Sequence, residues 1–293
     1  MPLKAILWGV DGTLAETERD GHRVAFNRAF IACGLSWHWS EARYGELLPI
    51  CGGRERLLRD MCERPDAPRQ AEERDALARR IHAAKDTIYP DLLRHVHLPL
   101  REGVMALMQE CRSGGIRMGI ATTTRRACVE ALLRRHLGAD WTAWFDAIVC
   151  GEDVRHRKPD PEVYVRALLQ ARVCPSQAVA IEDSPAGAAA ARAVDIPVVL
   201  ARSSYFAAAS VTGVAALGPG LDQRAGWQPD AGLDADGRPG IHVADIARWA
   251  TLAQVRQRDG LASRPAGAAF AADRSPLQPD RSVPWPQQFP PGS

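Results

Sequence analysis

Residues 5–14 read Ala-Ile-Leu-Trp-Gly-Val-Asp-Gly-Thr-Leu, and this stretch decides the fold. Its apolar part predicts a short strand over residues 4–10 that is buried on both faces, as strands of parallel sheets are. The strand stops at Asp11-Gly12-Thr13, where Gly12 suits a sharp turn. Because Asp-Gly is a common turn signal, its meaning depends on the residues at the ends of the other strands.

The composition is that of an ordinary globular protein. The chain has 293 residues, of which 46% are hydrophobic and 25% are charged, and its net charge is +2. This length suits one domain with an insertion, and the charge leaves no basis for a nucleic-acid partner. We expect no membrane partner, because the apolar runs are too short to span a bilayer. The seven cysteines are scattered singly, and no secretory pattern opens the chain, so we expect reduced thiols and a cytoplasmic protein.

Beyond residue 99 the hydrophobic period alternates between strand and helix. Strands are predicted over residues 116–121, 147–149, 178–181 and 197–200, with helices over 104–112, 124–136, 160–171 and 185–194. Such alternation favours an α/β fold with a doubly wound parallel sheet, formed by residues 1–14 and 99–256. Residues 15–98 form a mostly helical insertion, and residues 241–256 a last helix. The Pro- and Ala-rich residues 257–293 are predicted to be a disordered tail.

Two further strand–helix junctions carry groups that suit phosphate. Thr122, Thr123 and Thr124 end one strand just before a helix, where a hydroxyl and free backbone N–H groups can bind a phosphoryl oxygen. The alternative is a simple helix cap. Lys158 precedes a helix that begins at Asp160-Pro161, and its ammonium can neutralise a phosphoryl group. The alternative for Lys158 is an ordinary surface lysine.

The last junction carries two acids. Glu182 and Asp183 follow an apolar strand and precede a helix that begins at Ser184-Pro185. Two carboxylates there supply the hard oxygen ligands that Mg²⁺ prefers. Acids at a helix start also interact favourably with the helix dipole, which is the alternative.

Taken together and in this order, the four junctions resemble those of the haloacid-dehalogenase superfamily of phosphatases, over roughly residues 1–217. The insertion is similar to the helical cap of that family. Residues 14–18, 22–26, 44–48 and 52–56 resemble the CbbY branch, whose members accompany carbon-fixation genes and hydrolyse sugar phosphates, including xylulose 1,5-bisphosphate. The resemblance implies a Rossmann-like core, a hydrolase, Mg²⁺ as cofactor and a small sugar phosphate as partner. We expect a monomer.

The resemblance also implies roles for single residues. Asp11 protonates the leaving alkoxide and then activates water, and its backbone carbonyl contacts Mg²⁺. Thr122 binds the phosphoryl oxygen, Lys158 screens charge, and Glu182 and Asp183 hold the metal. The positions that match substrate-facing residues are Glu16, His22, Gly53, Arg54, Lys85, Thr123 and Thr124. Of these, Arg54 and Lys85 suit a second, non-reacting phosphate.

Gly9 stands where the family has its nucleophilic aspartate. The family reaction runs through an aspartyl-phosphate, which glycine cannot form, and glycine also supplies no side-chain oxygen to the metal. Loss of a nucleophile costs about 10⁴–10⁶-fold in kcat. A natural pseudoenzyme, a substituted or misread codon and an unusual residual mechanism remain open explanations. The chain is therefore either a sugar-phosphate phosphatase, with a phosphomutase as a variant, or a catalytically silent sugar-phosphate binder or regulator.

The tail allows a first prediction. Since residues 262–293 lack periodic apolar positions, their deletion should leave the melting temperature of the protein unchanged within error. Differential scanning calorimetry of the full and truncated chains measures this. A clear fall in Tm on truncation would show that the tail packs on the folded part.

Overall fold

The computed structural model of the chain describes residues 2–50, 52–232 and 237–262. Its centre is a six-stranded, all-parallel sheet with the order β3-β2-β1-β4-β5-β6, which confirms the predicted fold class. The strands are β1 Ala5–Trp8, β2 Arg117–Ala121, β3 Ala147–Val149, β4 Ala178–Glu182, β5 Val198–Ala201 and β6 Ala216–Gly218. The last of these was not predicted, whereas β3, which is equally short, was.

Strand β1 lies in the middle of the sheet and is covered on both faces. Trp8 pairs in register with Ile120 of β2 on one side and with Ile181 of β4 on the other. Ile6 and Trp8 belong to the apolar cluster on one face, and Ala5 and Leu7 to the cluster on the opposite face. All four side chains of β1 are fully buried, as the apolar run predicts.

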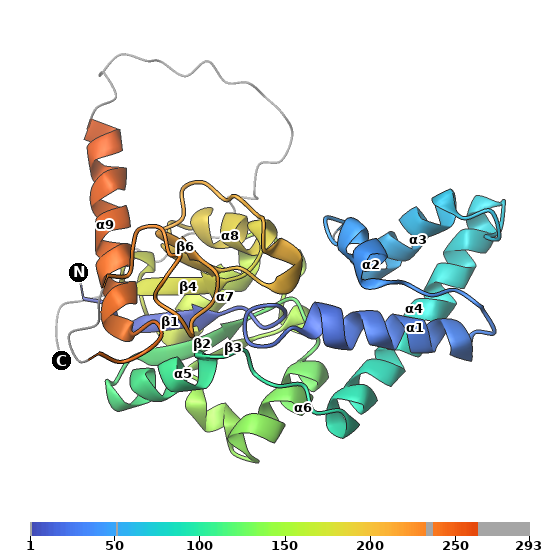
Figure 1. Cartoon of the computed structure of the whole chain (residues 1–293), viewed down its shortest axis with the longest axis horizontal. Helices are drawn as coiled ribbons and strands as arrows, with labels where there is room; N and C mark the ends of the chain where they lie inside the picture. Colours follow the sequence, from blue (N-terminus) through green and yellow to red (C-terminus); the bar gives the residue numbers. More distant parts are fainter. Residues whose placement is uncertain (1, 51, 233–236, 263–293) are drawn as a thin grey trace.

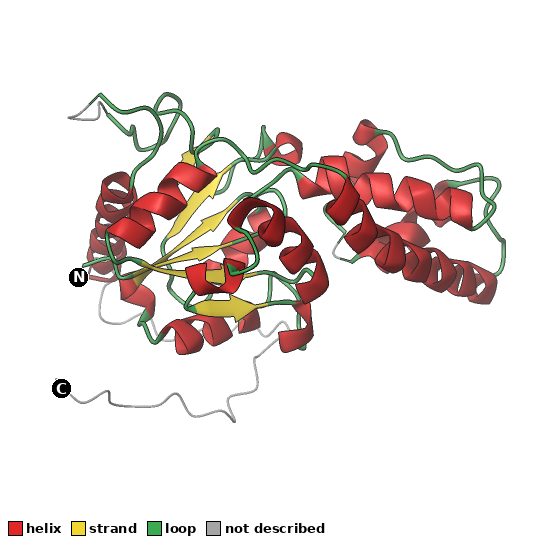
Figure 2. Cartoon of the chain, turned by 90° about the horizontal axis from the view of Figure 1, so that it is seen from below, coloured by secondary structure: helices red, strands yellow, loops and turns green. Residues whose placement is uncertain are grey.

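Helices cover both faces of the sheet (Figures 1 and 2). The cluster that holds Ile6 and Trp8 is completed by α5, α6 and α9, and the opposite cluster by α7 and α8. These helices are α5 Val104–Ser113, α6 Arg126–Leu137, α7 Glu162–Ala171, α8 Pro185–Arg192 and α9 Val243–Ala262. Short 3₁₀ turns lie at Trp141–Trp144, Gly151–Asp153, Pro175–Gln177 and Ser204–Phe206.

All helices between β1 and α5 lie to one side of the sheet, beyond the end toward which β1 runs (Figure 1). We call this segment the cap. It contains a π-helical turn at Glu18–His22 and the helices α1 Arg23–Ala32, α2 Glu41–Leu47, α3 Gly53–Glu63 and α4 Ala71–His95. The cap has an apolar cluster of its own, in which Phe26, Phe30 and Trp39 pack with ring centroids about 5 Å apart. It is thus a second packed unit joined to the sheet by two short linkers.

The chain after β6 folds back on the sheet. The rings of Trp227 and Trp249 stack with their centroids 4.8 Å apart, and Arg224 donates to both carboxylate oxygens of Asp245 at 2.8 Å. Helix α9 continues to Ala262, so the predicted end of the helix at Arg256 was too early. Most of the predicted tail, residues 263–293, lies outside the described residues. Within those that are described, every helix is too short or too polar to cross a membrane.

The packing of α9 gives a stability prediction. Trp249 is fully buried against Trp227, so Trp249→Ala should lower the free energy of unfolding by about 3–5 kcal/mol, typical for loss of a large buried ring. Urea denaturation of both proteins measures this. Leu252→Ala on the same helix is the control, since Leu252 is 42% exposed and should change stability little. Equal losses would place α9 outside the cooperative core.

Candidate active site

A cavity of about 230 Å³ lies between the carboxyl ends of the strands and the cap. Its core side is lined by residues that follow β1, β2 and β4, as expected for a parallel sheet. The residues that were predicted from the sequence and that line it are Gly9, Asp11, His22, Gly53, Lys85, Thr122, Thr123, Thr124, Lys158, Glu182 and Asp183. Most of the predicted site therefore meets at one cavity.

Three side chains hold the carboxylate of Asp11 in place. Thr17 donates to its Oδ1 at 2.6 Å, His22 Nε2 lies 3.3 Å from the same oxygen, and Thr124 donates to its Oδ2. Burial alone would raise the pKa of Asp11, but His22 and these hydrogen bonds hold it well below its ordinary value. In this arrangement the carboxylate is ionised and acts as a proton acceptor.

Thr122 and Thr124 lie between the strand and the helix. The N–H of Thr122 continues the sheet by donating to Val149 O, and Thr122 Oγ1 accepts from the N–H of Thr124. Helix α6 begins at Arg126 and not at residue 124, because the Thr124 side chain turns to Asp11. The three threonines thus form a turn whose polar groups face the cavity.

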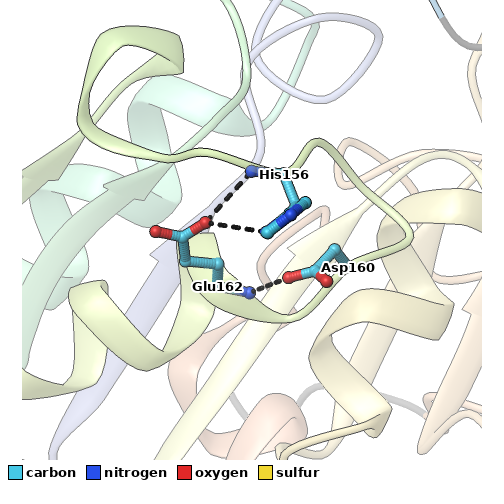
Figure 3. A group of neighbouring side chains, drawn as sticks. All are labelled: His156, Asp160 and Glu162. Atoms are coloured by element: carbon cyan, nitrogen blue, oxygen red, sulfur yellow. Dashed lines mark hydrogen bonds and ion pairs between the residues drawn. The ribbon is translucent and has the colours of Figure 1, made fainter. Parts of the chain in front are cut away.

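The loop that carries Lys158 is held by hydrogen bonds of Glu162 and Asp160, which Figure 3 shows together with His156. Glu162 Oε2 accepts from the backbone N–H groups of Arg155 at 2.8 Å and His156 at 3.0 Å, and Asp160 Oδ1 accepts from the N–H of Glu162. His156, Asp160 and Glu162 lie close enough to hold an ion, but these bonds explain their closeness as loop structure. The result is a fixed loop from which the Lys158 side chain reaches the site.

Lys158 and Glu182 form the buried ion pair of the site. The Lys158 ammonium donates to Ala121 O at 2.8 Å and to Glu182 Oε1, which also accepts from the buried Tyr164 hydroxyl. The Glu182 side chain is only 3% exposed. A carboxylate this deep is stable only with such partners. Tyr164 was not predicted, and its place three residues after Pro161 gave no signal beyond core packing.

Asp183 is short of positive charge. Ser203 donates to its Oδ2 at 2.7 Å and Thr13 to its Oδ1 at 3.4 Å. Burial, and next the neighbouring charge of Glu182, raise the pKa of Asp183 to about 8. A buried carboxyl group whose charge is disfavoured in this way, next to a second buried carboxylate, is a donor set that a divalent cation stabilises. The residues present therefore fit a hard cation such as Mg²⁺.

Position 9 is crowded although it holds glycine. A Cβ placed there would lie 2.7 Å from Thr13 Oγ1 and 3.1 Å from Glu182 Oε2. Both contacts are ends of side chains rather than backbone. The space beside Gly9 is thus partly filled by Glu182, and a larger residue would require Thr13 and Glu182 to move.

Glu16 and Arg54 do not line the cavity. Glu16 accepts from the N–H and hydroxyl of Ser204 and lies 3.5 Å from Arg101 Nε, so it joins a linker of the cap to the core. Arg54 donates to Asp75 on α4. Of the two cations that the resemblance suggested for a second phosphate, only Lys85 lines the cavity.

Other cavity residues were missed by sequence reasoning. They are Glu18, Tyr44, Arg56, His82, Asp86, Arg125 and Arg157. His82 and Asp86 follow one another by one helical turn on α4, beside the apolar stripe of that helix, and flank Lys85. This row of polar residues on a helix with an apolar stripe was the sequence feature from which His82 and Asp86 could have been predicted. The others come from loops or from helices whose orientation depends on tertiary packing.

Known proteins resemble the chain along most of its length. The family model described as haloacid dehalogenase-like hydrolase matches residues 3–195. The CbbY protein encoded on a plasmid of Cupriavidus necator is 37% identical over 87% of this chain and 96% of its own length. CbbY of Rhodobacter capsulatus is 40% identical over 70% of this chain and 88% of its own.

Solved structures agree. CbbY from Rhodobacter sphaeroides, as a variant in complex with xylulose-(1,5)bisphosphate, has a TM-score of 0.64 and 37% identity. The match covers 72% of this chain and 92% of that one. The same protein in complex with phosphate matches equally well.

The acid pair gives a pH prediction. The pKa of Asp183 is raised from 3.8 to about 8, so between these values the folded chain holds a proton that the unfolded chain has lost. This contribution to stability is complete below pH 4 and is lost as pH rises toward 8.

With a chelator present, the free energy of unfolding of the wild type should fall by up to about 1.4 kcal/mol per pH unit as pH rises. In Asp183→Asn this fall should be absent. Denaturant curves between pH 5 and 8 measure the slope. The exposed Asp140→Asn is the control and should keep the wild-type slope. Parallel curves for wild type and Asp183→Asn would contradict the assignment.

Proposed function

We propose that this chain, which belongs to the haloacid dehalogenase-like hydrolase family and to its CbbY branch, carries a Mg²⁺-dependent sugar-phosphate phosphatase site whose turnover is held down by Gly9. The observation that carries the proposal is the meeting of Asp11, Lys158 and the Glu182–Asp183 pair at one cavity. Acid–base, phosphate-binding and cation-binding groups are then within one site.

In the proposed reaction each group has one task. Thr122 donates to a phosphoryl oxygen, and Lys158 neutralises charge that develops on the phosphoryl group. Asp11 donates a proton to the leaving sugar oxygen as its bond to phosphorus breaks, and takes a proton from the water molecule that attacks phosphorus. Because His22 and Thr17 hold Asp11 ionised, it must take up a proton, or move away from these partners, before it can act as an acid.

The cation would be held by Glu182, Asp183 and the backbone carbonyl of Asp11. Mg²⁺ bound there would supply positive charge to the transferring phosphoryl group. Its binding would also lower the pKa of Asp183, since it adds the positive charge that this buried pair lacks.

Gly9 favours a second candidate function as well. Without a carboxylate at position 9, the Lys158 ammonium is paired with Glu182, and the site keeps its polar groups without a nucleophile. Such a chain can bind a sugar phosphate and act as a silent binder or regulator. A phosphomutase is a third variant, because it shares the same groups.

The substrate class is proposed from the cap. Lys85 and Arg125 both line the cavity and flank the carboxylate of Asp86, and there a second anionic group could bind. CbbY of Rhodobacter sphaeroides binds xylulose-(1,5)bisphosphate. We therefore propose a pentose bisphosphate as ligand, with a role in carbon fixation and a monomeric protein of the cytoplasm.

Gly9→Asp tests the proposal. The new carboxylate restores the missing nucleophile beside Lys158, so Mg²⁺-dependent phosphate release from xylulose 1,5-bisphosphate should rise by roughly 10⁴-fold or more. The variant should also lose about 1–3 kcal/mol of stability, because Thr13 and Glu182 must move to make room. A malachite-green assay and a denaturant curve measure the two effects.

Gly9→Asn is the matched control, since it has the same crowding and no nucleophilic charge. It should lose similar stability and gain no activity. A folded Gly9→Asp protein that binds the ligand and yet is no more active than the natural chain would exclude the phosphatase and leave the binder.

A further inference from the structure

One carboxylate in the cavity wall is shared by a histidine and two cationic side chains. Asp86 Oδ2 lies 3.1 Å from His82 Nδ1 and 2.7 Å from Arg125 Nη2, and Asp86 Oδ1 lies 3.7 Å from Lys85 Nζ. His82, Lys85 and Asp86 belong to α4 of the cap, whereas Arg125 follows the threonine turn of the core. All four line the cavity. Asp86 therefore joins cap to core across the cavity.

The four side chains differ in how firmly they are held. Lys85 and Asp86 are 11% and 13% exposed, but the Arg125 side chain is 58% exposed. The Lys85 ammonium also lies over the rings of Tyr89 and Phe26, at 4.8 and 5.6 Å from their centroids. Asp86 and Lys85 are thus mostly buried in the wall, whereas more than half of the Arg125 side chain is exposed.

Lys85 is poorly neutralised where it lies. Burial removes water from the Lys85 ammonium and lowers its pKa, and the charge of Asp86, which at 3.7 Å is too far for a hydrogen bond, offsets only part of this effect. An anion that approached Lys85 and Arg125 would improve the surroundings of both. It would also meet the negative charge of Asp86 at the same place.

We propose that Asp86 is a specificity-determining residue. In the free protein its carboxylate lies beside Arg125 and Lys85, and an anionic group of the substrate must replace it at these two cations in order to bind. Asp86 then keeps the cations in place in the free protein and weakens binding of every ligand that has a second negative group. Ligands whose distal end is uncharged leave the Asp86–Arg125 pair intact. This inference rests on the proposed function for the kind of ligand.

The test compares two ligands in Asp86→Asn. Removal of the competing charge should tighten binding of xylulose 1,5-bisphosphate by about tenfold, because a like charge beside a bound anion is costly. Binding of xylulose 5-phosphate with its single phosphate should change less than about threefold by the same reasoning. Isothermal titration calorimetry of the full chain measures both, and turnover is not needed.

Two variants serve as controls. Asp75→Asn removes another acid of α4, one that pairs with Arg54 and Arg79 and does not line the cavity, and it should change neither affinity. Adding Arg125→Gln to Asp86→Asn should remove most of the gain. Weaker bisphosphate binding in Asp86→Asn, or equal changes for both ligands, would overturn the proposal.

Inorganic phosphate separates this inference from the proposed function. If the natural chain binds neither sugar phosphate, the proposed function fails, and the exchange at Asp86 is then judged on phosphate alone. Phosphate can bind at the Thr122–Lys158 end and at the Lys85–Arg125 end of the cavity, and only the binding event at the Lys85–Arg125 end should tighten in Asp86→Asn and not in the double variant with Arg125→Gln. If Asp86→Asn binds phosphate no more tightly, the exchange is refuted whatever the sugar-phosphate result.

Discussion

The guanidinium of Arg101 holds together the part of the molecule on which the site depends. It donates to the backbone carbonyls of Gly12, Ala201, Arg202 and Pro219, which belong to the segments that leave β1, β5 and β6. Its Nε faces Glu16, and its own N–H donates to Leu14 O. Carbonyls at strand ends have no partner in the sheet, and one planar cation with five donors satisfies several at once. Since Arg101 and Glu16 lie on the two linkers of the cap, the same interaction fixes where the cap leaves and re-enters the core.

Backbone hydrogen bonds of the sheet explain why a glycine at position 9 leaves the other side chains of the site in place. The backbone at Gly9 is fixed by the sheet, through its N–H to Ile181 O, and not by its side chain. The charge that a carboxylate there would have balanced is balanced by Glu182, which accepts from Lys158 and Tyr164. Loss of the nucleophile therefore changes chemistry far more than structure. The nucleophile of such a site can be regained by a change at one residue, at a moderate cost in stability where Thr13 and Glu182 must move.

The core side of the site could be predicted from the sequence, whereas much of the cap side could not. Short apolar runs followed by polar residues mark the carboxyl ends of buried strands, and in a parallel sheet these ends share one edge, where Asp11 lies. Strand β6 was missed although β3, which is equally short, was predicted. On the cap, the orientation of helices decides which face meets the cavity, so Arg54 pairs with Asp75 while Lys85 faces the site. A resemblance to a family predicts which residue type stands at a position. It does not predict which residue distant in the sequence will form an ion pair with that side chain.

The electrostatics of the cavity argue that the site is adapted to a charged ligand. Burial raises the pKa of Asp183 and lowers that of Lys85, so each group is held where its charged form is disfavoured. Neither charge is needed to fold the chain, since apolar groups of similar size would pack in such places at no desolvation cost. Both groups line the same cavity, and in each the cost of burial outweighs the opposite charges nearby. A divalent cation would stabilise the charged form of Asp183, and a phosphate bound with it would stabilise the charged form of Lys85. Binding of such a ligand, unlike its turnover, does not require a carboxylate at position 9.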